Sequence, residues 1–440
     1  MPITCDQVAK VFPQETFLKL GNGVTLVHQE IPTAAVVSVD VWVKAGATSD
    51  SEHSLGMAHF LEHMIFKGTN LIAPGEFDLV IESEGGISNA ATSHDYAHYT
   101  FTVDASRFAI TLPYLSQMLL EAKIDEKQLE QERLVVLEEL RQAMDDPDWC
   151  AYQHLMETVY GSHPYSRSVL GVEEVITQIT AVQMREYHRL HYRPEYMTVA
   201  IAGAITREKA LMLVDAAFNS NKFARNSYSR TCENPVTHNP VTPIFSLPTS
   251  HRQTISLPRL QHSRLNLAWH GPSVDNLEDA IQLELISAIL TEGRSARLVR
   301  ELIEECSWVQ DIASSFSMQQ QAGLFTISAY LDADYLEPVE NKIIQQVKEL
   351  LNNPISDAEL NKVKRSLCNH FTFALESPNQ LANFLGYYSL LGCETLCTDW
   401  SNAYCEIIRK VKSVDLQGLV KRYLSPENCI ITCVIPEAIA

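Results

Sequence analysis

The pattern of hydrophobic and polar positions in the first 45 residues is that of β-strands. Residues 36–43 alternate with a period of two, and two shorter apolar runs at 18–20 and 24–28 flank the dipeptide Asn22-Gly23. A period of two is typical of a strand with one buried face, and Asn-Gly between apolar runs is a strong hairpin signal. The pattern therefore predicts that the chain opens with antiparallel strands.

Helices and further strands are predicted after residue 50. Residues 51–67 are predicted to form a helix with Ser51 or Ser54 as its N-terminal cap. Residues 85–103 return to strand character because they are rich in Thr, Tyr and Val. Helices are expected from about residue 113 to 142 and onward to 192, before an apolar strand at 197–202.

A change of composition divides the chain. Between residues 222 and 250, four prolines lie among Ser, Thr and Asn, which is typical of a linker. Beyond it, the order of strands and helices begins again. We therefore predict an N-terminal domain at 1–221, a linker at 222–250 and a C-terminal domain at 251–440.

An internal repeat supports this division. The segments that begin at Ile176 and Ile408 align without a gap, so that the Pro-Glu pair at 194–195 falls on the pair at 426–427. A period this long, more than half of the chain, indicates repeated domains, because solenoid units span only about 20–50 residues. We expect an α+β fold of two homologous domains, each a mostly antiparallel sheet with packed helices, facing one another as a clamshell.

The amino-acid composition and net charge exclude some classes of protein. The content of 46% hydrophobic and 20% charged residues is that of a soluble globular protein. The 34 Lys and Arg against 54 Asp and Glu give a net charge of −20, which argues against nucleic acid and suits basic or neutral peptides. We expect no membrane span, because no apolar stretch approaches about 20 residues. The N-terminus lacks a secretory signal, which predicts a cytoplasmic protein, or one of an organellar matrix if a presequence has been removed.

The strongest chemical signal is His59-x-x-Glu62-His63 within the predicted helix 51–67. Residues three and four apart share a helix face, so both imidazoles and the carboxylate point the same way. Two imidazoles suit a catalytic zinc that keeps one position open for water, and Glu62 is placed to take a proton from that water. A polar face or a buried histidine pair is the alternative for so short a pattern.

Four separate segments resemble the pitrilysin/insulysin zinc metallopeptidases, and most of all their short-chain branch, which includes the mitochondrial processing peptidase. They are GMAHFLEHMIFKGT (56–69), GGISNAATSHDYAHYTF (85–101), SHPYSRSVLG (162–171) and HYRPEYMTVAIAG (191–203). Tyr196 departs from the family pattern, which has Asn at this position. The resemblance covers essentially the whole chain and implies one Zn²⁺ per chain.

The resemblance also implies a third zinc ligand, a glutamate that follows the second histidine at a spacing typical of the family. Glu139 satisfies this spacing, since 139 − 63 = 76. The same family pattern makes Glu132, two helical turns earlier, a second catalytic carboxylate that steers the site without touching the metal. Glu138 is interpreted as a solvated or hydrogen-bonding acid.

The resemblance further implies that substrate is laid down as an extra strand along the strand that contains Asn89, Ala90 and Thr92. Such pairing reads the peptide backbone, so the expected substrates are unfolded peptides of varied sequence, enclosed in a chamber.

The C-terminal half departs from the family pattern. By eye, Glu284, Ser287 and Ala288 fall where the zinc helix has its motif, so no second metal site is expected there. The segment from Gly293 resembles one that ends in an Arg/Tyr pair reaching toward the substrate carbonyl, but Ile303 and Gln310 stand at those positions.

These features leave three hypotheses open. The first is a zinc endopeptidase subunit that forms a heterodimer with a homologous partner carrying the Arg/Tyr pair. The second is a self-sufficient homodimer. The third, from a different class, is a non-catalytic scaffold like the core subunits of a respiratory complex.

Overall fold

The computed structural model describes residues 17–219, 252–258, 260–393 and 400–437. Two compact units divide it. The first draws on Met1–Arg141, Ser168–Asn239 and Thr372–Asn402, and the second on Gln142–Arg167, Pro240–Phe371 and Ala403–Ala440. The predicted linker 222–250 lies entirely outside the described residues.

The first unit is built on a sheet with strand order β1-β2-β6-β3-β5-β4. Of its described strands, β2 and β6 pair in parallel and the other neighbours pair antiparallel. The strands are β1 (Phe17–Lys19), β2 (Thr25–Glu30), β3 (Val36–Val43), β4 (Ile87–Thr92), β5 (Ala97–Asp104) and β6 (Met197–Gly203). The helices are α2 (Met57–Ile65), α3 (Glu76–Ser83), α4 (Phe108–Glu121), α5 (Glu126–Asp145), α7 (Glu173–Ile176), α8 (Ala181–His191), α9 (Arg207–Phe218) and α13 (Pro378–Leu390), with 3₁₀ turns at Ala47–Ser49 and Pro194–Tyr196.

The opening strands lie where the alternation predicts them. β1 and β2 form the hairpin around Asn22-Gly23, with Gly23 at a φ of 97° and the Val24 amide donating to the Asn22 side chain. Residues 85–103 form two antiparallel strands, β4 and β5, and not one, because the Ser93 amide bonds to the Tyr96 carbonyl and closes a tight turn.

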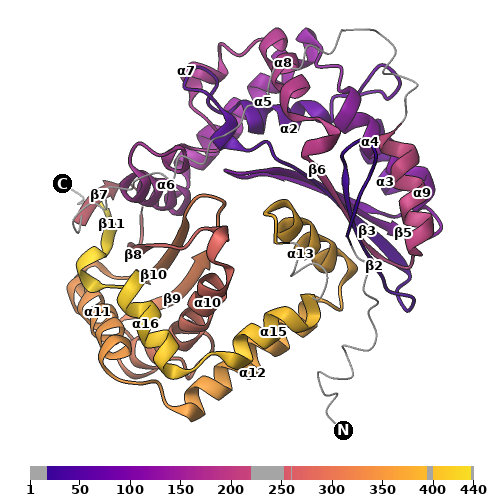
Figure 1. Cartoon of the computed structure of the whole chain (residues 1–440). Helices are drawn as coiled ribbons and strands as arrows, with labels where there is room; N and C mark the ends of the chain where they lie inside the picture. The colour runs from indigo at the N-terminus through magenta and orange to yellow at the C-terminus, as the bar shows by residue number, and fades with distance from the viewer. Residues whose placement is uncertain (1–16, 220–251, 259, 394–399, 438–440) are drawn as a thin grey trace. The chain divides into compact units, whose positions relative to one another are not determined.

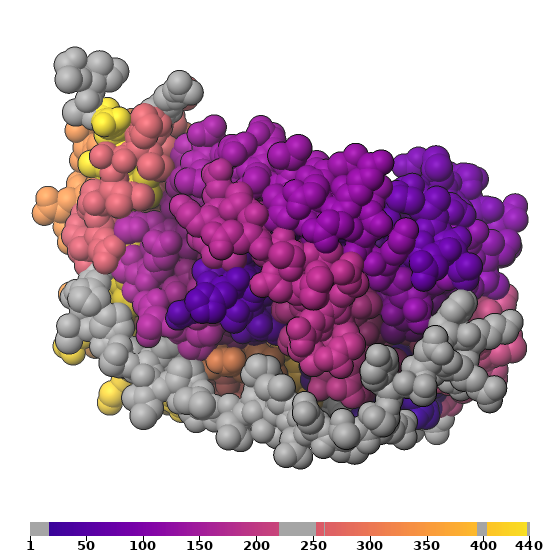
Figure 2. Space-filling model, turned by 90° about the horizontal axis from the view of Figure 1, so that it is seen from above, coloured from indigo at the N-terminus to yellow at the C-terminus, as the bar shows by residue number. Residues whose placement is uncertain are grey.

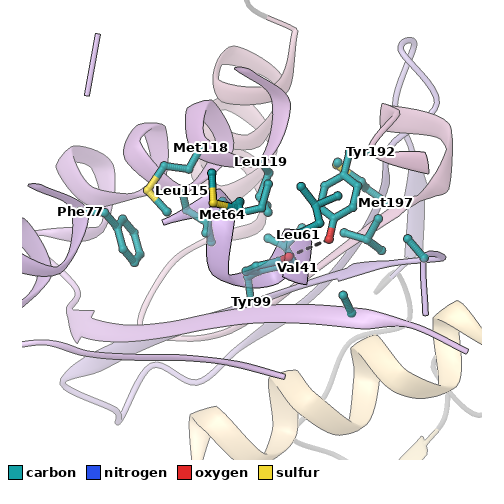
Figure 3. Close-up of a cluster of buried hydrophobic side chains, with 14 of the residues drawn as sticks. Val41, Leu61, Met64, Phe77, Tyr99, Leu115, Met118, Leu119, Tyr192 and Met197 are labelled. Carbon is teal, nitrogen blue, oxygen red and sulfur yellow. Dashed lines mark hydrogen bonds between the residues drawn. The ribbon is translucent and has the colours of Figure 1, made fainter. Parts of the chain in front are cut away.

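The core of the first unit lies between one face of the sheet and α2, α4, α5 and α8 (Figure 1). Leu61 and Met64 of α2 pack over Tyr99 of β5, whose hydroxyl lies 2.7 Å from that of Tyr192 (Figure 3). Burial raises the pKa of Tyr99 well above its ordinary value, so this pair is a neutral hydrogen bond under the helix that carries His59.

The second unit repeats the plan of the first. Its sheet has the order β7-β11-β8-β10-β9, and β7 and β11 form its parallel pair. The strands are β7 (Arg252–Leu257), β8 (Ser263–Gly271), β9 (Val309–Ser317), β10 (Gly323–Leu331) and β11 (Ile430–Pro436). The helices are α6 (Pro147–Tyr160), α10 (Leu277–Thr291), α11 (Leu336–Asn352), α12 (Asp357–Ala374), α15 (Trp400–Lys410) and α16 (Ser413–Tyr423), with short turns at Pro164–Ser166, Val274–Asn276, Ala333–Tyr335 and Pro426–Asn428 and a π-helical stretch at Val299–Glu305.

The internal repeat of the sequence is visible in the elements. α8 begins at Ala181 and α16 at Ser413, and 413 − 181 equals 408 − 176, the interval between the two aligned segments. Each helix is followed by a 3₁₀ turn and by the strand that pairs in parallel with the first long strand of its sheet, β6 with β2 and β11 with β7. The predicted duplication into two similar α+β halves therefore appears as two sheets that share the order of five strands, to which the first sheet adds β1.

Two helices belong to the unit opposite to their place in the chain. α13, from the C-terminal half, packs on β3 and β6 of the first sheet, where Asn383 donates to Asp40 and Gly386 lets Trp42 approach. α6, from the N-terminal half, packs on β8 and β11 of the second. The two units therefore differ from the predicted division of the chain at 221 and 251, because each contains one helix from the other half of the chain. Among the described residues, no helix combines the length and apolar character needed to cross a membrane.

Candidate metal centre and active site

The helix with the two histidines, α2, begins at Met57, six residues later than predicted. Its N-cap is Gly56, in the left-handed region at a φ of 87°. The cap is supplied by Asp50, whose carboxylate accepts from the amides of Gly56 (2.9 Å) and Ala58 (3.2 Å). Ser51 and Ser54 bond to each other in the preceding turn and do not cap the helix, which corrects the sequence prediction. Burial raises the pKa of Asp50 to about 7.

Three candidate metal donors converge between α2 and α5. Glu139 Oε2 lies 3.6 Å from His59 Nε2 and 3.2 Å from His63 Nε2, and the ligand atoms of the three residues all lie within 4.8 Å of one another. Donors bonded to a tetrahedral zinc at about 2.0–2.1 Å are about 3.3 Å apart. The spacing and the two-imidazole, one-carboxylate set therefore fit a catalytic zinc.

A second carboxylate sets the orientation of one imidazole. Glu132 is buried on α5, and its Oε1 lies 3.0 Å from His63 Nδ1 while its Oε2 lies 2.6 Å from Lys67 Nζ. Because Nδ1–H donates to Glu132, Nε2 of His63 is left as the atom that faces Glu139. Glu132 thus lies two helical turns before Glu139 and contacts Nδ1 of His63.

The charges of this group are strongly coupled. Burial alone would lower the pKa of His63, but hydrogen bonds to Glu132 and Glu139 outweigh it and raise that pKa to about 9. Hydrogen bonds from His59 and His63 hold the pKa of Glu139 well below its ordinary value. Burial would raise the pKa of Glu132, but His63 and Lys67 bring it below its ordinary value. Glu132 and Glu139 are therefore carboxylates at neutral pH.

Glu62, the candidate base, points from α2 toward the edge of the sheet. The Thr92 hydroxyl donates to its Oε2 at 2.5 Å, and Glu62 is partly buried. This hydrogen bond occupies one carboxylate oxygen and leaves the other for a water molecule. The side chain of Thr92 therefore contacts Glu62, whereas the sequence predicts that Thr92 contacts substrate.

The strand that carries Thr92, β4, is the outermost strand of its sheet. Ala90 packs against the core, whereas Asn89 is exposed. Since β4 pairs only with β5 in the described part of the chain, its other edge presents backbone groups, as the predicted addition of a substrate strand requires.

Sequence reasoning missed two residues of the site. Lys67 lies in the turn just after α2, where its amide donates to the Met64 carbonyl, so the helical spacing of the motif did not indicate that it would reach Glu132. Asp50 had no signal either, because its capping role depends on the turn that separates it from Gly56. Glu138 is exposed and lies 3.9 Å from Arg141, as expected for a solvated acid.

The second unit holds no comparable donors among the residues described. On α10, Glu284 accepts from the Tyr404 hydroxyl, and burial raises its pKa to about 7, while Ser287 donates to the Ser314 carbonyl. Ala288 is buried. These three residues are engaged in packing and hydrogen bonds, and His59, His63 and Glu139 remain the metal-type cluster found in the described chain.

The two positions of the missing Arg/Tyr pair lie within the π-helical stretch and on β9. Ile303 is partly buried against the core of the second unit. Gln310 is exposed, and its side-chain nitrogen lies 2.9 Å from the ring of His262. The nearby arginines at 294, 297 and 300 are paired with Glu304, Glu359 and Glu305.

Comparisons with known proteins bear on the family and the fold of the chain. Two family models match the chain, "Insulinase (Peptidase family M16)" at residues 25–173 and "Peptidase M16 inactive domain" at 178–367. An uncharacterized zinc protease of Bacillus subtilis is 26% identical and covers 94% of this chain and 97% of its own length. A probable mitochondrial-processing peptidase subunit beta of Arabidopsis thaliana is 24% identical, with 96% and 79% covered. The crystal structure of a protease from Helicobacter pylori has a TM-score of 0.86 at 25% identity and covers 96% of this chain and 99% of that one. This likeness over both halves confirms the predicted two-domain α+β fold.

Proposed function

Because the chain belongs to peptidase family M16, as the resemblance predicted, we propose that it is the zinc-binding subunit of an endopeptidase that hydrolyses unfolded peptides. The observation that carries the proposal is the convergence of His59 Nε2, His63 Nε2 and Glu139 Oε2 beside Glu62. Relatives named zinc proteases support it.

In this proposal His59, His63 and Glu139 hold one Zn²⁺, which supplies Lewis acidity toward the scissile carbonyl and toward water. Glu62 accepts the proton of the attacking water on the oxygen that Thr92 leaves open, and passes it to the leaving amine. Thr92 keeps the carboxylate of Glu62 from turning away. Glu132 and Lys67 hold the ring of His63.

The free edge of β4 is the proposed substrate platform. A peptide paired there contributes main-chain hydrogen bonds, so the site accepts many sequences but only extended chains. The net charge of −20 favours basic or neutral peptides over acidic ones. The enclosing chamber implied by the resemblance is part of this proposal.

A homologous partner is proposed because this chain lacks two donors. Isoleucine at 303 has no polar group, and glutamine at 310 offers a neutral amide. The loss of one oxyanion-stabilising donor typically costs ~10²–10³ in rate. A heterodimer with a homologue that carries the Arg/Tyr pair would restore both donors, and a homodimer would not.

A non-catalytic scaffold is the second candidate. It is favoured by the match of residues 178–367 to a domain described as inactive and by the two missing donors. A scaffold, however, has no use for three converging metal donors with Glu62 and Glu132 in place beside them. Metal content therefore separates the two functions.

The test combines metal analysis with peptide cleavage. The purified chain should hold about one equivalent of zinc and cut an internally quenched basic peptide slowly. Homologues encoded beside it and carrying the pair should raise turnover by orders of magnitude, and Glu62→Gln should abolish the gain. Zinc well below one equivalent would favour the scaffold. Full turnover by the isolated chain would defeat the two-subunit mechanism and leave the zinc assignment standing.

A further inference from the structure

The proposed chemistry leaves one part of a sequence motif without a role, the end of SHPYSRSVLG and the residues after it. Residues 168–179 run between α6 and α8 and belong to the first unit, together with α2 and most of α5. They contain Gly171, the short helix α7 and the turn that ends at Ile179. Their contacts are of interest because α2 and α5 together carry the candidate metal ligands.

One end of this segment is seated on the N-terminus of α2. Gly171 lies at a φ of 78°, and a Cβ there would come within 2.5 Å of the Leu55 carbonyl oxygen and 2.6 Å of Gly56 Cα. The fit is reciprocal, because a Cβ on Gly56 would lie 2.8 Å from the Leu170 oxygen. All of these neighbours are backbone atoms, which cannot swing aside as a flexible side chain can.

The other end of the segment is held by α5. Arg133 donates to the carbonyl of Ile176 through one terminal nitrogen and to that of Ile179 through the other, at 2.8 Å for the second bond. The guanidinium is buried and lies 5.8 Å from the ring centroid of Phe60, a core residue of α2. Arg133 therefore contacts both α2 and the segment 168–179.

A third contact is weaker. Arg141, near the end of α5, pairs with Glu173 of α7 at 3.0 Å, but both side chains are about half exposed. Exposed ion pairs contribute little. The connection between segment and helices thus rests on Gly171 and Arg133.

We propose that residues 168–179 are a brace that sets the spacing of α2 and α5, and that Gly171 and Arg133 are positioning residues of the metal centre. The proposal rests on the proposed function for the identity of the site. His59 and His63 come from one helix and Glu139 from the other, so a shift of one helix against the other changes donor distances that now stand at 3.2 and 3.6 Å. Figure 2 shows indigo atoms from the start of the chain bordered by magenta atoms, the colour of the region around residue 170.

Ordinary core packing is the competing explanation. If the segment only stabilises the fold, then its variants lower stability and leave the zinc affinity of the folded fraction unchanged. A brace instead acts on metal affinity and coordination in protein that is still folded, because second-sphere disturbance typically costs 10–100-fold in affinity.

The chain offers a matched control for Gly171. Gly75 has nearly the same φ, 77°, and a Cβ there meets nothing within 4 Å. Gly75→Ala and Gly171→Ala therefore share the cost of a left-handed alanine, and only the second presses on the backbone of α2. We expect zinc dissociation constants, measured by chelator competition, to be within about twofold of the unaltered chain for Gly75→Ala and to rise 10–100-fold for Gly171→Ala.

A second pair of variants keeps the test decisive if Gly171→Ala does not fold. Arg133→Lys retains a charge near the segment. Arg133→Met removes the hydrogen bonds to the carbonyls of Ile176 and Ile179 and also the ion pair with the exposed Glu130. Arg185→Met is the control, because Arg185 also donates to a backbone carbonyl, that of Ile124 at 2.7 Å, but donates to no carbonyl of the segment. We expect zinc affinity to fall in the order unaltered, Lys, Met, with Arg185→Met unchanged.

The absorption spectrum of the Co²⁺-substituted protein reports coordination directly, and thermal unfolding of each metal-free variant reports stability. A spectrum altered in Gly171→Ala and Arg133→Met, but not in the controls, is the expected result. Variants that are less stable but keep the zinc affinity and the Co²⁺ spectrum of the unaltered chain would overturn the brace while leaving the proposed function intact. If the unaltered chain itself bound no zinc, both would fail.

Discussion

Glu132 offers the most direct check on the metal centre, because its effect can be measured without any enzymatic activity. One carboxylate oxygen orients His63 at 3.0 Å and the other pairs with Lys67 at 2.6 Å. Glu132→Ala removes both contacts, frees the imidazole to rotate and leaves the ammonium without its partner. We expect zinc affinity to fall 10–100-fold, which corresponds to about 1.4–2.7 kcal/mol.

A graded series sharpens this prediction. Glu132→Gln retains an oxygen that accepts from His63 Nδ1–H but carries no charge for Lys67, so its loss of affinity should be smaller. Glu138→Gln is the control. Glu138 lies on the same helix beside a metal donor, but it is exposed and its contact with Arg141 is long, at 3.9 Å. Affinities come from chelator competition at about pH 7, with circular dichroism as a check on folding. Zinc affinity that is equal in Glu132→Ala and in the unaltered chain would refute the reasoning.

Three further predictions concern α2. Glu62→Gln should keep about one equivalent of zinc, since Thr92 can still donate to the amide oxygen, and should lower turnover by ~10²–10⁴ because the amide cannot take a proton; near-normal turnover would remove Glu62 from the role of base. Asp50→Ala should lower the free energy of unfolding by about 1–2 kcal/mol in urea titrations, because the first amides of α2 lose their acceptor, and an unchanged midpoint would contradict this. In the metal-free chain the pKa of His63 lies above its unfolded value of 6.5, at about 9, because its hydrogen bonds to glutamates outweigh burial. The stability that protonated His63 contributes should therefore be complete below pH 6.5 and lost as the pH rises to 9. Urea unfolding across this range should show the decline in the unaltered metal-free chain and not in His63→Gln.

The features that depend on local spacing could be predicted from the amino-acid sequence. The alternation at 36–43 coincides with β3, and the Asn-Gly signal lies in the β1–β2 hairpin. The interval of three and four residues placed His59, Glu62 and His63 on one helix. The internal repeat identified the matching pair α8 and α16. Each of these patterns is a property of neighbouring residues or of two similar segments, so it is legible without knowing what packs against what.

Which distant groups meet depends on how the whole chain packs. The start of α2 at Met57 follows from the carboxylate of Asp50, and the orientation of Glu62 follows from the hydroxyl of Thr92, on a strand far along the chain. The contact between Gly56 and Gly171 joins backbones more than a hundred positions apart, and α6 and α13 each pack on the sheet of the other half of the chain. Local periodicity describes which face of an element is apolar, but not which partner covers that face or which polar group satisfies an exposed amide. Those choices are made when the whole chain packs, because only then are the competing partners brought within hydrogen-bonding distance.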